Sequence, residues 1–81
     1  MKKEDMLVML SEKEMFIRAL EAALQVDERS EVDSICYNLD FAARDEIITI
    51  IFKGGGIKRI LATGNSNGAN AKEIIKAVYG K

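Results

Sequence analysis

The chain lacks three residue types that often mark catalytic chemistry or domain linkers. Its 81 residues include no histidine, no tryptophan and no proline. Without histidine, the commonest general base and the commonest metal ligand are absent. Without proline, the residue that most often punctuates a linker is absent too. No spacing of the other potential ligands fits a metal site, so the sequence predicts no metal, no cofactor and no small-molecule site.

Cysteine is almost as scarce, because Cys36 is the only one. An intramolecular disulfide is therefore impossible, which excludes a disulfide-stapled secreted scaffold. With no histidine to activate the thiol, we interpret Cys36 as an exposed structural thiol and not as a nucleophile. Adjacent acids such as Asp45 and Glu46 are typical of turns and do not indicate an acid/base pair. The sequence thus predicts a protein that is not an enzyme.

No long hydrophobic run is present. A membrane-spanning helix needs ~20 apolar residues, and the opening Met-Lys-Lys-Glu-Asp places acids where the apolar stretch of a signal peptide would begin. We expect a cytoplasmic protein without membrane contact. The length predicts one small domain over residues 1–81.

Charge is divided unevenly along the chain. Residues 1–40 hold ten acids and five bases, whereas residues 41–81 hold three acids and seven bases. Two interpretations remain open at this point: the two halves attract each other within one fold, or the second half presents a basic face to an anionic partner.

The N-terminal third of the chain has the apolar spacing of a helix that buries one stripe. Ser11 and Glu14 fit a capping box, which predicts a helix from Ser11 to about Leu24. The same apolar phase continues backwards, so a single helix from about Glu4 is the alternative. Lys13 would fall within the apolar stripe of that longer helix, which favours a break at Ser11.

Strict alternation follows a polar loop at residues 27–31 and predicts a half-buried antiparallel strand over residues 34–41. Its apolar face consists of Ile35, Tyr37, Leu39 and Phe41. We expect a turn at residues 43–46 and a second strand from Ile47 to Lys53 that is apolar on both faces.

Three consecutive glycines then predict a tight hairpin, because glycine reaches positive φ angles without strain. The register has two solutions. A two-residue turn at Gly54–Gly55 pairs Ile48 with Leu61, and a three-residue turn pairs Ile50 with Ile60. We prefer the first, which turns Ile60 towards the outer side of the sheet together with Ala62.

The segment after the hairpin is typical of a loop followed by a helix. Residues 64–72 resemble a phosphate-binding loop, but their spacing does not match that motif and predicts a turn with a helix cap. Ser66 is the favoured N-cap, Asn70 is a later candidate, and Gly80 is the expected stop. The residues expected to face the sheet are Ala71, Ile74, Ile75 and Val78.

These elements predict an α+β fold in the order α-β-β-β-α, with a three-stranded antiparallel sheet and both helices on one face. The layout resembles the double-stranded RNA-binding domain in topology. Residues 42–46 lack that family's Gly-Pro and histidine, and Lys72 is followed by Glu73 and an isoleucine, so we expect no tight binding to duplex RNA. The layout is also similar to small phage-encoded proteins, including some anti-CRISPR inhibitors.

The function class that remains is a small non-enzymatic interaction protein that works through protein–protein contact, with a regulator or inhibitor as its expected type. The residues predicted to make the contact are Lys53, Lys58, Arg59, Ile47 and Ile51. The expected partner is another protein or a second copy, with a homodimer as the first expectation. The alternative is a weak nucleic-acid-binding module in which those bases act together with Lys72 and Lys76.

Overall fold

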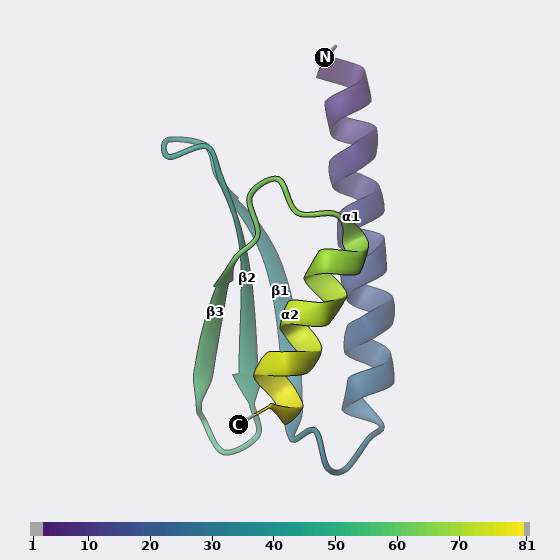
Figure 1. Ribbon diagram of the computed structural model, residues 1–81, viewed down its shortest axis with the longest axis vertical. Coiled ribbons are helices and arrows are strands. Elements are labelled where there is room, and N and C mark those ends of the chain that lie inside the picture. The colour runs from purple at the N-terminus through teal and green to yellow at the C-terminus, as the bar shows by residue number, and fades with distance from the viewer. Residues whose placement is uncertain (1–2, 81) are drawn as a thin grey trace.

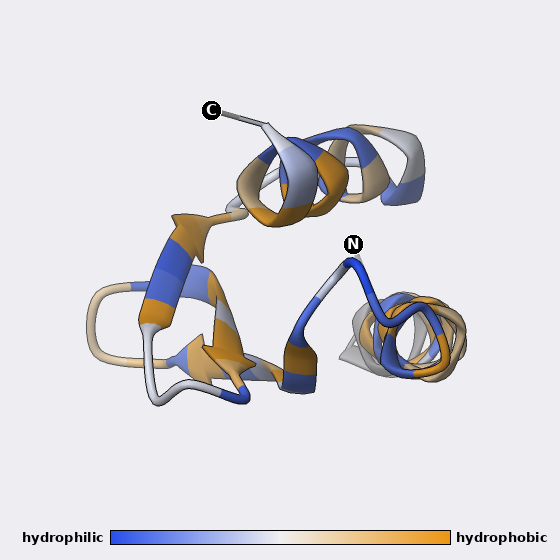
Figure 2. Ribbon diagram, turned by 90° about the horizontal axis from the view of Figure 1, so that it is seen from below, coloured by the Kyte–Doolittle hydropathy of each residue, from blue (hydrophilic) through white to orange (hydrophobic). Residues whose placement is uncertain are grey.

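The computed structural model describes the backbone of residues 3–80 and the side chains of residues 8–80. Its elements are α1 (Lys3–Gln25), β1 (Val32–Asp40), β2 (Asp45–Phe52), β3 (Ile57–Leu61) and α2 (Asn67–Tyr79). The three strands form one antiparallel sheet in the order β1-β2-β3, and both helices lie on the same side of it (Figures 1 and 2). The predicted α+β fold and the order of its elements are confirmed.

The core lies between this sheet and the two helices. Ile48 and Ile50 of the central strand are fully buried, and they share the core cluster with Ile17 of α1 and Ile74 of α2. Successive residues of a strand point to opposite faces, so alternate residues of β2 supply the centre of the core. Below, the inner face is the side of the sheet that carries Ile48 and Ile50, and the outer face is the opposite side.

The first helix is continuous through Ser11, so the predicted break at this residue is wrong and the single long helix is observed. Ser11 is exposed in the interior of the helix. Lys13 does lie in the buried stripe, but its ammonium group pairs with the Glu46 carboxylate at 2.7 Å. That distant partner makes a buried lysine tolerable, which the local pattern around Ser11 could not indicate.

We expect Ser11→Ala to leave the free energy of unfolding unchanged or to raise it by up to about 0.5 kcal/mol, because alanine is the better residue inside a helix. Ser66→Ala should lower it by about 1 kcal/mol, because Ser66 is the true N-cap of α2 and its hydroxyl accepts the Ala69 N–H. Urea unfolding of both variants measures the difference. An equal loss in the two variants would contradict the assignment of a single cap.

The turn between β1 and β2 comes earlier than predicted. β1 ends at Asp40, whose carboxylate accepts the Ala43 N–H at 3.1 Å, and Arg44 takes the left-handed conformation with φ of 58°. Phe41, expected on the buried face of the strand, therefore lies in the turn and is 80 % exposed. Glu46, expected in the turn, lies within β2.

The register of the β2–β3 hairpin differs from both predicted solutions, because Ile47 pairs with Leu61 and Ile48 with Ile60. Three residues lie between Phe52 and Gly56, and the Phe52 N–H donates to the Gly56 carbonyl at 2.8 Å. Gly55, the last of these three residues, has a φ of 93°. A left-handed residue closing a three-residue loop is a common hairpin geometry.

This shift of one residue from the preferred register reverses the faces of β3. Ile60 and Ala62, predicted on the outer side, lie on the inner side, where Ala62 is fully buried and Ile60 packs against the core. Ile57 and Leu61 lie on the outer side. Arg59 joins them there and is exposed, and Lys58 takes an inward-facing position in its place.

The last helix begins and ends as predicted, at Ser66 and Gly80. Gly80 ends it in an extended conformation, and its N–H donates to the Lys76 carbonyl. Asn70, the later cap candidate, is instead fully buried inside the helix, and Ile75, expected to face the sheet, is 45 % exposed. Relative to the prediction, the helix is therefore rotated about its axis. Asn70, Ile74 and the residues one helical turn further along face the core.

Candidate functional site

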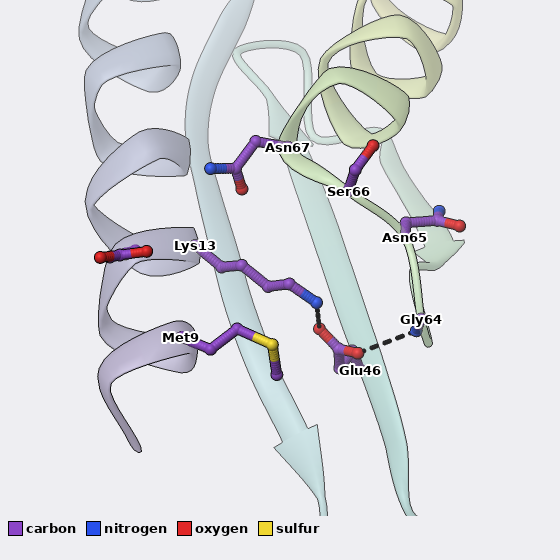
Figure 3. Close-up of a pocket in the computed structure, with 8 residues that line it drawn as sticks. Met9, Lys13, Glu46, Gly64, Asn65, Ser66 and Asn67 are labelled. Atoms are coloured by element: carbon purple, nitrogen blue, oxygen red, sulfur yellow. Dashed lines mark hydrogen bonds and ion pairs between the residues drawn. The ribbon is translucent and has the colours of Figure 1, made fainter. Parts of the chain in front are cut away.

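A pocket of about 400 Å³ opens between α1, the start of β2 and the loop that precedes α2 (Figure 3). It is lined by Met9, Glu12, Lys13, Glu46, Gly64, Asn65, Ser66 and Asn67. Charged and polar groups converge here, so this pocket is the first place to look for chemistry.

Glu46 is the centre of this pocket. One carboxylate oxygen, Oε1, accepts hydrogen bonds from the Lys13 ammonium at 2.7 Å and the Tyr37 hydroxyl at 2.6 Å. The other oxygen, Oε2, accepts the Gly64 N–H at 2.9 Å. These donors belong to α1, β1 and the loop before α2. A single carboxylate in β2 therefore ties four segments together.

Burial opposes ionisation of Glu46, but the hydrogen bonds from Lys13, Tyr37 and Gly64 outweigh it, so the pKa of Glu46 is lowered. Burial, together with the charge of Glu46, raises the pKa of Tyr37 and keeps its hydroxyl protonated as a donor. A general base needs a pKa near the working pH. The Glu46 pKa moves away from that range, which is the behaviour of a structural ion pair.

Backbone N–H groups in the loop before α2 and at the start of this helix also have acceptors within the protein. The Gly64 N–H is donated to Glu46, and the Ala69 N–H is donated to the Ser66 hydroxyl at 3.2 Å. The Glu46 carboxylate thus already accepts the Gly64 N–H that a bound anion would need at this position. The geometry agrees with the predicted turn and helix cap.

The outer face is the second candidate site. Ile47 lies between Asn38 of β1 and Leu61 of β3, and two residues further along β2, Ile51 lies between Ser34 and Ile57. The apolar side chains among these form what we call the apolar strip: Ile47, Ile51, Ile57 and Leu61. Ile57 is 58 % exposed and Leu61 is 67 % exposed. No described helix crosses this face (Figure 2).

Charged side chains surround the apolar strip. Arg59 lies in the middle of β3, opposite Thr49, and is exposed. Lys53 lies in the exposed hairpin loop at one end of the sheet. The paired residues Asp40 and Asp45 lie at the other end. The outer face therefore carries two apolar pairs with Arg59 between them, Lys53 at one end and two acids at the other.

Lys58 is separated from the other predicted contact residues. It pairs with the inward-facing Ile50, its ammonium donates to the Ala77 carbonyl of α2 at 2.7 Å, and it lies 5.7 Å from the centre of the Phe52 ring. The remaining predicted contact residues are Ile47, Ile51 and Arg59, which share the outer face, and Lys53 at its end. Lys58 instead stabilises the contact between β3 and the last turn of α2.

Sequence reasoning missed two parts of these sites. The preferred register, which pairs Ile48 with Leu61, puts Leu61 and with it Ile57 on the inner side, because its turn is one residue shorter than the observed one. The pairing of Lys13 with Glu46 was not foreseen. The signal that could have revealed it was the lysine within an apolar helical stripe, since a buried lysine requires an acidic partner.

Within residues 8–80, no three cysteine, aspartate or glutamate side chains gather closely enough to hold a metal ion. Neither of the helices, as far as the structure describes them, combines the length and the apolar character needed to cross a bilayer. Comparison of the chain with protein-family models, curated proteins and solved structures finds no match.

Proposed function

We propose that this protein is a non-enzymatic interaction protein that binds another protein through the outer face of its sheet. The observation that supports the proposal is the apolar strip, whose residues Ile57 and Leu61 are exposed and whose residues Ile47 and Ile51 are partly exposed, on a sheet with both helices on its other side. Exposed apolar side chains gathered on one face of a small protein often mark an interaction site.

The surroundings of the strip support the same proposal. Protein interfaces combine an apolar centre with a polar rim, and arginine is enriched in them. Here Arg59 lies between the apolar pairs, and Ser34, Cys36 and Asn38 of β1 border them with small polar groups. Asp40 adds negative charge at the far end. A partner surface that is apolar, with charges placed opposite to these, fits this face.

The arrangement of the bases gives less support to the nucleic-acid alternative. Arg59 and Lys58 point to opposite sides of the sheet, and the Lys58 ammonium is engaged by α2. Asp40 and Asp45 share the outer face with Arg59 and would repel a phosphate backbone. Binding that weakens steeply with salt would be the sign of the nucleic-acid function.

The test uses Cys36, which is exposed on the outer face and is the only thiol. A partner captured from the native host should slow the reaction of this thiol with an alkylating reagent, because the partner covers it. Ile51→Lys should weaken the partner's binding at least tenfold, since it places a charge in an apolar contact. Ile75→Lys is the matched control, because it makes the same change on α2. Equal binding by the two variants would contradict the proposal.

A second copy of the chain is the first partner to examine, because a two-fold axis uses the same patch twice. If the protein self-associates through the outer face, light scattering of the wild type should give the mass of a dimer, and Ile51→Lys should give that of a folded monomer. A wild type that stays monomeric at high micromolar concentration would rule out self-association and leave a different protein as the partner.

A further inference from the structure

The two edge strands of the sheet, β1 and β3, differ in whether other parts of the protein bond to their outward backbone groups. Along β1, the Glu21 carboxylate of α1 accepts the Ile35 N–H at 2.6 Å, and the Gln25 amide donates to the Asp33 carbonyl at 2.6 Å. Side chains of α1 thus occupy backbone groups that would otherwise be free to pair with another strand. Covering an edge in this way is how natural sheets avoid unwanted pairing.

The β3 edge has no such cover. The bonds from Phe52 to Gly56 and from Ala62 to Glu46 show that the even-numbered residues of β3 pair with β2. The N–H and C=O groups of Ile57, Arg59 and Leu61 therefore point away from the sheet. None of these groups bonds to another described residue outside the sheet. Helix α2 lies over the inner face and leaves this edge open (Figures 1 and 2).

We propose that this edge binds an extended segment of the partner protein as a fourth, antiparallel strand. The inference rests on the proposed function and names the chemistry of the partner. Backbone groups of the added strand would pair with the outward groups of Ile57, Arg59 and Leu61, which is the usual mode of strand addition at an open edge. The β1 edge is less suited to this role, because α1 side chains already bond to its Ile35 N–H and Asp33 carbonyl.

The side chains of β3 define the sequence that fits. Ile57 and Leu61 are exposed and apolar, and Arg59 lies between them without an ion pair to any other described residue. Side chains directly opposite each other on paired strands interact. The complementary segment therefore carries an acidic residue opposite Arg59 and an apolar residue two positions away on each side. All three would project from the outer face beside the apolar strip.

The same charge argues against a second copy at this edge. Antiparallel pairing of β3 with the β3 of another copy over its full length would place Arg59 opposite Arg59. Like charges directly opposite each other destabilise paired strands. An acidic residue in that position removes the repulsion and gains an ion pair, so we assign the edge to a segment of a different protein.

The test uses the blocked synthetic peptide Thr-Val-Thr-Glu-Thr-Val-Thr and the whole chain labelled for NMR. The peptide should shift the amide signals of Ile57, Arg59 and Leu61 and slow their hydrogen exchange, with no effect on Ile35. A peptide with lysine in place of glutamate should bind roughly tenfold more weakly. Arg59→Glu should reverse this preference, and because Arg59 is exposed, the exchange keeps the fold intact.

Backbone methylation of the peptide separates strand pairing from simple charge attraction. Methyl groups on the nitrogens of the glutamate and the two valines should abolish binding, because these N–H groups face β3. Methyl groups on the intervening threonine nitrogens should not. Equal effects of the two methylation patterns, shifts centred on β1, or no binding up to millimolar peptide would each overturn the inference. The proposed function would survive that failure if Ile51→Lys still weakened binding of the native partner.

Discussion

Replacing Glu46 by alanine is expected to lower the free energy of unfolding by about 3–5 kcal/mol, the usual cost of removing one partner from a buried ion pair. The change leaves the Lys13 ammonium without its counter-ion in a position where the side chain is only 10 % exposed. It also removes the acceptor for the Tyr37 hydroxyl and the Gly64 N–H. Urea unfolding monitored by circular dichroism measures the loss.

The double variant Lys13→Met with Glu46→Gln is the control for this prediction. It removes both charges and keeps similar side-chain volumes, so no unpaired charge is left in the protein. Its loss of stability should be smaller than that of Glu46→Ala. A loss below about 1 kcal/mol for Glu46→Ala would show that the cluster does not hold the elements together.

The same cluster predicts how stability depends on pH. Because the folded pKa of Glu46 is below its ordinary value of 4.5, the carboxylate contributes stability that is fully present above about pH 4.5. That contribution is lost as the pH falls through the lowered folded pKa, since the folded protein must then take up a proton. The stability difference between wild type and Glu46→Gln should therefore shrink in acid. A difference that is constant down to pH 2 would contradict this assignment.

Ile48→Ala is expected to cost about 2–5 kcal/mol, because it opens a cavity at a side chain that is fully buried between the sheet and the helices. Small domains have a total stability of roughly 5–15 kcal/mol. We therefore expect this variant to lose a large part of its stability and to melt at a clearly lower temperature than the wild type, as circular dichroism would measure.

Ile47→Ala is the matched control, because it makes the same change at the neighbouring residue on the outer face. Ile47 is only partly buried, and its removal should cost less than about 1 kcal/mol, since the side chain loses less buried area and leaves no enclosed cavity. If the two variants lost equal stability, the assignment of inner and outer faces to β2 would be wrong.

Local sequence patterns determined the type and order of the elements. The alternation in β1 predicts a strand because side chains on a strand reverse direction at every residue. The cap at Ser66 was also predictable, because its hydroxyl acts on an N–H only three residues away. Ile47 and Ile51 could be assigned to the outer face for the same reason, since Ile48 and Ile50 of the same strand fill the other face.

The tertiary structure decided the features that depend on contacts between residues far apart in sequence. Ser11 satisfies the pattern of a cap, but the helix runs through it. Lys13, the residue that favoured a break, is accommodated by pairing with Glu46, which is 33 residues away in sequence. The hairpin register decided which residues of β3 lie on the outer face. The local sequence allowed several turns, so it could not fix this register. The observed turn is the one that buries Ile60 and Ala62 against the helices and leaves Arg59 exposed on the outer face. Burial of apolar side chains in the core between sheet and helices favours this register, and that gain cannot be read from the turn sequence alone.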